Sequence, residues 1–131
     1  MAGHKVVHRA SGNRERTETL GPYRLEALLS ESEEEGGTAY RVSLAPHQTT
    51  ATSYHEIAEE FYFVLGGSGT ALLDGQEYVL RTGDFLRLPP GTRHSFVTAE
   101  QTLELLDIHL PGCRPDRDTF FMPDTAGKTS P

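Results

Sequence analysis

Residues 71–91 read ALLDGQEYVLRTGDFLRLPPG. The pair Asp74-Gly75 separates two short runs, and it is the strongest local signal for a two-residue β-hairpin, because both central residues of a type I′ turn need positive φ. The sequence Pro-Pro-Gly at 89–91 forces a second tight turn directly after the run Phe85–Leu88. This stretch therefore predicts short strands joined by tight turns.

The same pattern continues on both sides of this stretch. Short apolar or alternating runs are separated by glycine, proline and aspartate at close spacing, which is typical of an all-β sandwich or barrel. The predicted strands are Tyr23–Leu29, Thr38–Leu44, Phe61–Leu65, Thr70–Leu73, Glu77–Leu80, Phe85–Leu88, His94–Thr98 and Leu103–Leu110.

The chain has 131 residues, which by size predicts one domain. Residues 1–16 carry four Lys or Arg against one Glu and have little to bury, so we expect a flexible basic arm over residues 1–19. The β-barrel domain is expected over residues 20–122. The small polar residues after it predict a flexible tail over residues 123–131.

Composition excludes several classes of protein. A formal net charge of -7 disfavours nucleic-acid binding, which needs a basic surface. No stretch approaches the roughly 20 apolar residues of a membrane span, and the first residues lack the apolar core of a secretory signal. Cys113 is the single cysteine, so an internal disulfide and a cysteine-built zinc site are excluded. These features predict a cytoplasmic protein.

Three polar residues lie where strands begin or turns end. His55 precedes Glu60, which directly precedes the strand Phe61–Leu65, and His94 follows the Pro-Pro-Gly turn. Two imidazoles and one carboxylate are the ligand set of a facial triad, which leaves coordination positions open for substrate. The three residues are therefore candidate metal ligands.

Two longer segments strengthen this hypothesis. In residues 53–67, His55 is followed after four residues by Glu60 and after six more by Gly67, and residues 83–94 have the pattern Gly-x5-Pro-x-Gly-x2-His. These segments resemble the two sequence motifs of the cupin superfamily. The resemblance covers roughly residues 38–111 and implies a small single-domain cupin, a jelly-roll barrel also called a double-stranded β-helix. It also implies a divalent Fe, Zn, Ni or Mn ion held by His55, Glu60 and His94.

One departure concerns the metal. The first histidine of the family's His-x-His pattern is Ser53 here. Three outcomes follow: water completes the ion's coordination, a further group such as His47 or His109 joins it, or the site has lost the metal and serves as a plain binding pocket.

Strand alternation predicts which side chains share the cavity with these ligands. Tyr62 lies on the side of Glu60, and Phe96 lies on the side of His94, so both are expected to line an apolar pocket with Ser53. Glu60 and Tyr62 are the candidate catalytic residues, although Tyr62 also fits a plain pocket wall. Such a pocket is typical of small-molecule sites.

The last predicted strand offers a further pair. Asp107 and His109 share one face and are a candidate acid–base pair of the pocket, with His109 also a candidate ligand-binding residue. Cys113 follows in a loop without an activating motif and is expected to be inert.

The resulting hypothesis is a metal-dependent enzyme that acts on a small organic molecule, with apolar or aromatic character because of Tyr62 and Phe96. Dioxygenase, isomerase or epimerase, and natural-product cyclase chemistry remain open. The alternative is a metal-free cupin module that binds a small molecule without redox chemistry. The resemblance also implies a homodimer.

Overall fold

The computed structural model describes residues 5–123 of the chain. These residues form strands joined by short loops, with two single-turn 3₁₀ helices. The elements in chain order are η1 (Arg14–Arg16), β1 (Thr17–Leu20), β2 (Tyr23–Ala27), η2 (Glu31–Glu33), β3 (Thr38–Leu44), β4 (Ser53–Tyr54), β5 (Glu59–Gly66), β6 (Ser68–Leu73), β7 (Gln76–Arg81), β8 (Phe85–Leu88), β9 (His94–Val97), β10 (Leu103–Leu110) and β11 (Phe120–Phe121).

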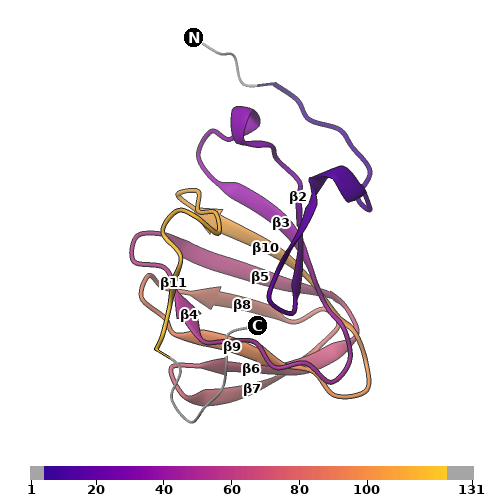
Figure 1. Cartoon of the computed structure of the whole chain (residues 1–131), viewed down its shortest axis with the longest axis vertical. Coiled ribbons are helices and arrows are strands. Elements are labelled where there is room, and N and C mark those ends of the chain that lie inside the picture. Colours follow the sequence, from indigo (N-terminus) through magenta and orange to yellow (C-terminus); the bar gives the residue numbers. More distant parts are fainter. Residues whose placement is uncertain (1–4, 124–131) are drawn as a thin grey trace.

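The strands form two antiparallel sheets that enclose the core (Figure 1). One sheet has the order β1-β2-β3-β10-β5-β8, and the other has the order β11-β4-β9-β6-β7. Along β3 and β10 buried side chains alternate with half-buried or exposed ones, as expected where one face of a sheet covers the core. The predicted all-β jelly-roll barrel is confirmed.

The predicted strands agree closely with the observed ones, and β3, β8 and β10 have the predicted bounds. Three short strands were not predicted: β1, β4 and β11. Thr17–Leu20 pairs with β2 and belongs to the sheet, and the domain boundary expected at residue 19 stays a prediction. The predicted tail lies outside the described residues except for Pro123.

Apolar side chains from both sheets fill the interior. Phe96 and Leu103 are fully buried, and the core extends over Tyr40, Val42, Leu44, Tyr62, Val64, Ala71, Leu80, Leu88 and Leu105. Within residues 5–123 no helix is long and apolar enough to cross a membrane.

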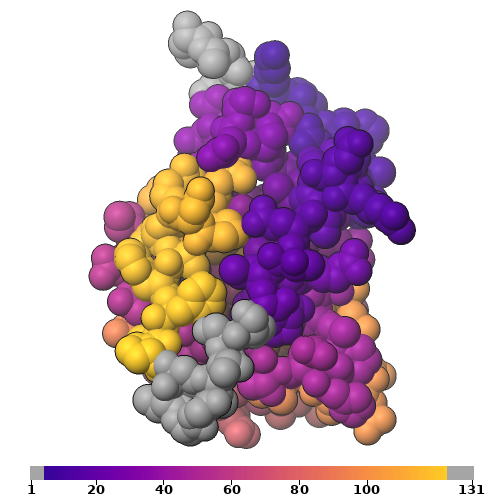
Figure 2. All heavy atoms as spheres, viewed as in Figure 1, coloured from indigo at the N-terminus to yellow at the C-terminus, as the bar shows by residue number. Residues whose placement is uncertain are grey.

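The segment before β1 is attached to the domain in this structure. The Arg9 guanidinium pairs with the Glu33 carboxylate at 2.6 Å, and the backbone N–H groups of Gly12 and Asn13 donate to the carboxylate of Glu26. On the face shown in Figure 2 the indigo N-terminal part of the chain, with the β1–β2 hairpin, lies beside the yellow C-terminal segment. The flexibility of the arm remains a prediction.

Candidate metal centre and pocket

Strand register assembles one half of the site in the six-stranded sheet. Glu60 on β5 stands opposite His109 on β10, and Tyr62 stands opposite Asp107. On the other side of β10, His109 stands opposite Thr38 of β3. Because side chains at alternate positions share a face, these residues all point into the barrel. Glu60, Asp107 and His109 are buried.

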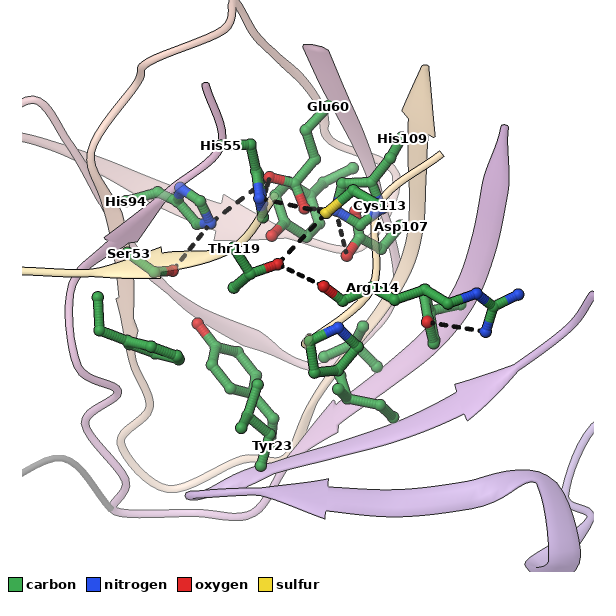
Figure 3. Close-up of a pocket in the computed structure, with 17 residues that line it drawn as sticks. Tyr23, Ser53, His55, Glu60, His94, Asp107, His109, Cys113, Arg114 and Thr119 are labelled. Carbon is green, nitrogen blue, oxygen red and sulfur yellow. Dashed lines mark hydrogen bonds and ion pairs between the residues drawn. The ribbon is translucent and has the colours of Figure 1, made fainter. Parts of the chain in front are cut away.

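The five-stranded sheet supplies the other half. His94 begins β9 opposite Ser53 of β4, and His55 directly follows β4. The two halves meet at the carboxylate of Glu60 (Figure 3). Glu60 Oε1 lies 3.2 Å from His55 Nε2 and 3.5 Å from His94 Nε2. The three predicted metal ligands therefore come together inside the barrel.

Hydrogen bonds to backbone carbonyls fix which nitrogen of each imidazole faces Glu60. His55 Nδ1 lies 2.8 Å from the carbonyl oxygen of Asp118, and His94 Nδ1 lies 3.1 Å from that of Thr92. A carbonyl oxygen only accepts, so both Nδ1 atoms carry the proton and donate it. In the neutral imidazole this leaves the lone pair on Nε2, directed at the site. This outer hydrogen bond is the usual arrangement of a metal-binding histidine.

Three electron-pair donors therefore converge on one point. Among the described residues, no hydrogen bond of good geometry reaches Glu60 Oε1, although the Glu60 side chain is only 2% exposed; its contacts are the ion pairs with His55 and His94. A buried carboxylate oxygen without a partner is costly, and a bound cation removes that cost. The ligand atoms of His55, Glu60 and His94 all lie within 4.8 Å of one another. The residues present fit a divalent metal ion.

The electrostatics show what occupies these donors when no metal is bound. Burial favours the neutral carboxyl of Glu60, but the charges of His94 and His109 outweigh it and hold the pKa of Glu60 well below its usual value. Burial also opposes protonation of His55, yet hydrogen bonds with Cys113 and Glu60 raise its pKa to about 10. For His94 burial wins, and its pKa is lowered. A proton on His55 thus takes the place of a cation beside an ionised Glu60.

The pair Asp107 and His109 lies on the other oxygen of Glu60. His109 Nε2 is 2.8 Å from Glu60 Oε2 and 3.7 Å from Asp107 Oδ2. Burial and the nearby Glu60 charge raise the pKa of Asp107 well above its usual value. Burial alone would lower the pKa of His109, but the charges of Asp107 and Glu60 raise it to about 12. The Glu60 charge thus favours a proton on each of its two neighbours, Asp107 and His109.

A pocket opens onto this cluster and is mostly apolar elsewhere. Its other walls come from the β1–β2 hairpin, from β3 and from the segment after β10, with Leu20, Tyr23, Leu25, Tyr40, Val42, Pro115, Thr119 and Phe121 among the lining residues. Arg114 also lines it, but its guanidinium pairs with Glu34 at 3.0 Å and donates to the Tyr40 hydroxyl. Its charge is already balanced, which leaves the pocket suited to an apolar molecule with few polar groups.

The predicted pocket residues divide into two groups. Ser53, Tyr62 and His109 line the pocket, and Ser53 Oγ lies 3.4 Å from His94 Nε2. Phe96 does not line it: its ring is fully buried and packs edge-on behind Tyr62, with the ring centroids 5.1 Å apart. The prediction of the face was right for Phe96, but its ring lies a layer deeper, in the core.

Cys113 was expected to be inert in a loop, and the structure places it at the site. Its Sγ lies 3.3 Å from His55 Nδ1, and the side chain is buried in the pocket wall. Burial raises the pKa of a thiol, but hydrogen bonds with His109 and His55 outweigh it and lower the pKa of Cys113 to about 7. No local pattern predicts this contact, because 58 residues separate the two partners in sequence.

Asp118 is a second residue that the sequence did not single out. Its carboxylate accepts hydrogen bonds from the backbone N–H groups of Glu56, Ile57 and Ala58, at 2.8 to 3.2 Å. Its own carbonyl accepts from His55. One residue of the C-terminal segment thus holds both the loop between β4 and β5 and the ring of His55.

Comparison with known proteins agrees with this architecture. A family model described as a cupin domain matches residues 40–109. Quercetin 2,3-dioxygenase of Bacillus subtilis is 37% identical over 59 residues, which are 45% of this chain and 18% of that protein. Protein SchB of Streptomyces halstedii is 33% identical over 73 residues, 56% of this chain and 53% of SchB. The matched segments thus span about half or less of these relatives.

Solved structures share the fold at low sequence identity. The polyketide cyclase RemF of Streptomyces resistomycificus has a TM-score of 0.73 and 23% identity, covering 93% of this chain and 87% of RemF. Streptomyces Pac13, a nucleoside dehydratase, has a TM-score of 0.67 and 19% identity, covering 88% of this chain and 95% of Pac13. The barrel, the two motif segments and the match over residues 40–109 together establish that this chain belongs to the cupin family.

Proposed function

We propose that this cupin is a metal-dependent enzyme that acts on a small organic metabolite of apolar or aromatic character. The ion is divalent Fe, Zn, Ni or Mn, and its ligands are His55, Glu60 and His94. The observation that carries the proposal is the convergence of two oriented imidazoles on Oε1 of a buried Glu60. Bound there, the ion would supply a Lewis acid that polarises a substrate carbonyl.

The remaining pocket residues support acid–base chemistry on such a substrate. Burial and the Glu60 charge raise the pKa of Asp107, which lines the pocket, and burial raises the pKa of the Tyr62 phenol, so both groups favour their protonated forms. Tyr23 and Leu25 form part of the pocket's apolar wall. Proton transfer between fixed acids and a bound substrate is what cyclisation, dehydration and isomerisation need.

Among the open reaction classes we therefore place cyclisation or isomerisation first. RemF, a polyketide cyclase on the same fold, is an example of that chemistry in a barrel of this size. A dioxygenase is the second candidate, supported by the sequence match with quercetin 2,3-dioxygenase. The two are separated by measuring oxygen uptake with aromatic substrates under turnover, because only the dioxygenase consumes oxygen.

The metal itself is tested by elemental analysis of protein purified without a histidine tag or chelator. We expect near-stoichiometric metal in the wild type and its loss in His55→Ala and His94→Ala. His47→Asn is the matched control, because His47 is exposed and has positive φ, which asparagine tolerates. Equal metal content in all four proteins would contradict the assigned ligands.

A metal-free binding module remains the alternative, and Ser53 favours it. This residue stands where the family's first histidine ligand is expected, and its hydroxyl contacts His94 instead. If the protein stays metal-free after reconstitution with each of the four metals, the binding module replaces the enzyme.

We also propose a homodimer, with the outer face of β5 and β8 as the contact. Phe63 and Phe85 are cross-strand partners on that face, 42% and 60% exposed, and Phe61 stacks on Phe85. Light scattering should give twice the chain mass of 14.5 kDa, and Phe85→Glu should give the monomer. A monomeric wild type would contradict this proposal. The cytoplasmic location stays a prediction from the sequence.

A further inference from the structure

The carboxylate of Glu60 has two oxygens, and each faces its own set of donors. Oε1 faces His55 and His94, whereas Oε2 lies 2.8 Å from His109 Nε2. Asp107 Oδ2 lies 3.7 Å from the same His109 nitrogen. The ligand atoms of Glu60, Asp107 and His109 come within 4.8 Å of one another, as do those of His55, Glu60 and His94. The two groups share Glu60.

The second group has unmet bonding capacity of its own. Among the described residues, Asp107 Oδ1 and Glu60 Oε1 are buried and make no hydrogen bond of good geometry, and the carboxylate contacts of His109 Nε2 are Glu60 Oε2 and Asp107 Oδ2. Native proteins contain few such buried oxygens, and each one calls for a physical explanation. Two of them on adjoining carboxylates would be satisfied by a bound cation.

The orientation of His109 is fixed in the same way as that of a metal ligand. The hydroxyl of Thr38 donates its one proton to the Cys113 carbonyl and accepts from the Cys113 N–H. Its remaining lone pair faces His109 Nδ1 at 3.2 Å, so Nδ1 carries the proton and donates it. The lone pair of a neutral His109 is then on Nε2, directed at Glu60 and Asp107.

We propose that Glu60 bridges two divalent cations. The first is held by Oε1 with His55 and His94, and the second by Oε2 with Asp107 and His109. This inference rests on the proposed metal site and extends it by a second ion. Two carboxylates and three imidazoles give mixed oxygen and nitrogen ligands, which suit Mn, Fe or Zn. The first ion would have two imidazoles and one carboxylate, and the second would have two carboxylates and one imidazole. Two adjacent ions in one pocket would bind a substrate with neighbouring oxygens, such as a β-diketone or an enediol, through both oxygens.

The test is the number of metal ions bound per chain. Metal-free full-length protein is titrated with Mn²⁺, and free and bound ion are separated by equilibrium dialysis while electron paramagnetic resonance records spin coupling. We expect two ions per chain and a coupled spectrum. Asp107→Asn and His109→Gln should each retain one ion with an uncoupled spectrum, and Glu60→Gln should weaken both sites. His47→Asn should retain two coupled ions.

The outcomes separate this inference from the proposed function. One ion per wild-type chain, unchanged in Asp107→Asn and His109→Gln, overturns the second site and leaves the first intact. No bound Mn²⁺ in the wild type overturns the second site, and reconstitution with Fe, Zn and Ni then decides the first. Near-ultraviolet circular dichroism checks that each variant is folded. Asp107→Asn and His109→Gln change different residues of the second site, so if one variant fails to fold, the other still tests whether the second ion binds.

Discussion

The Nδ1 of His55 lies 2.8 Å from the carbonyl oxygen of Asp118, across 63 residues of sequence. The same aspartate accepts three backbone N–H groups from residues 56–58 through its carboxylate. The C-terminal segment between β10 and β11 therefore sets the orientation of a candidate metal ligand that directly follows β4, the strand with which β11 pairs.

Removing this carboxylate should loosen the loop and the ligand together. Asp118→Ala leaves the three N–H groups to solvent, and we expect a loss of about 1–3 kcal/mol in the free energy of unfolding of the metal-free protein. Metal affinity should fall by less than about 10-fold, because the backbone carbonyl that accepts from His55 is kept and only its position becomes less fixed. Urea unfolding and metal competition measure the two effects. Asp118→Asn keeps one acceptor oxygen and should therefore lose less stability and less metal affinity.

Asp116 provides the matched control for this experiment. It is exposed in the same segment, and among the described residues its side chain makes no hydrogen bond or ion pair. Asp116→Ala should therefore leave stability and metal affinity unchanged. Equal effects of the two alanine substitutions would mean that the segment acts only through its overall charge.

The tautomer of His109 depends on the hydroxyl of Thr38. Thr38→Val removes the acceptor for His109 Nδ1 while keeping the side-chain shape, so a neutral His109 is free to place its proton on Nε2. The second Mn²⁺ should then bind about 10–100-fold more weakly, with the first unaffected. Thr38→Ser, which restores the hydroxyl, should rescue the second ion. Failure of serine to rescue would assign Thr38 a packing role.

A substitution of Phe96 tests whether this residue contributes to core packing alone. Because its ring is fully buried behind Tyr62, Phe96→Ala should cost about 3–5 kcal/mol of stability. Metal stoichiometry in the folded variant should remain that of the wild type. Denaturant unfolding and elemental analysis check both statements. A loss of metal without a loss of stability would mean that Phe96 contributes to the pocket and not to the core.

Alkaline pH should destabilise the fold through buried tyrosines. Burial raises the pKa of Tyr23, Tyr40 and Tyr62 above the ordinary value of about 10. The folded state thus keeps these phenols neutral where the unfolded chain ionises them, so their contribution is complete below pH 10 and is lost as pH rises above it. Tyrosinate absorbance should show the three groups ionising only as circular dichroism reports unfolding. Tyr23→Phe should remove one of the three phenols that ionise only when the protein unfolds.

Much of the fold was predictable because its signals are local. The turns at Asp74-Gly75 and Pro89-Pro90-Gly91 separate strands whose observed bounds lie within a few residues of the predicted ones. The strand β1 was missed because Thr17–Leu20 is polar and exposed at its centre, and its register comes from pairing with β2. Pairing of that kind leaves no pattern in the strand itself.

The site residues that could be predicted are likewise those with a local sequence signal. His55, Glu60 and His94 lie at fixed distances from turns and strand starts, so their meeting could be predicted. Cys113 and Asp118 reach His55 only because the segment after β10 folds back over the pocket mouth. The side of Phe96 followed from alternation, but its depth depends on Tyr62 standing in front of it.

The central claim is tested most directly by anomalous diffraction from crystals of the Mn²⁺-loaded protein. The account predicts anomalous density in contact with Oε1 of Glu60 and the Nε2 atoms of His55 and His94, with a second peak beside Oε2. Density elsewhere on the molecule, or a fully loaded crystal with none at Glu60, would contradict it.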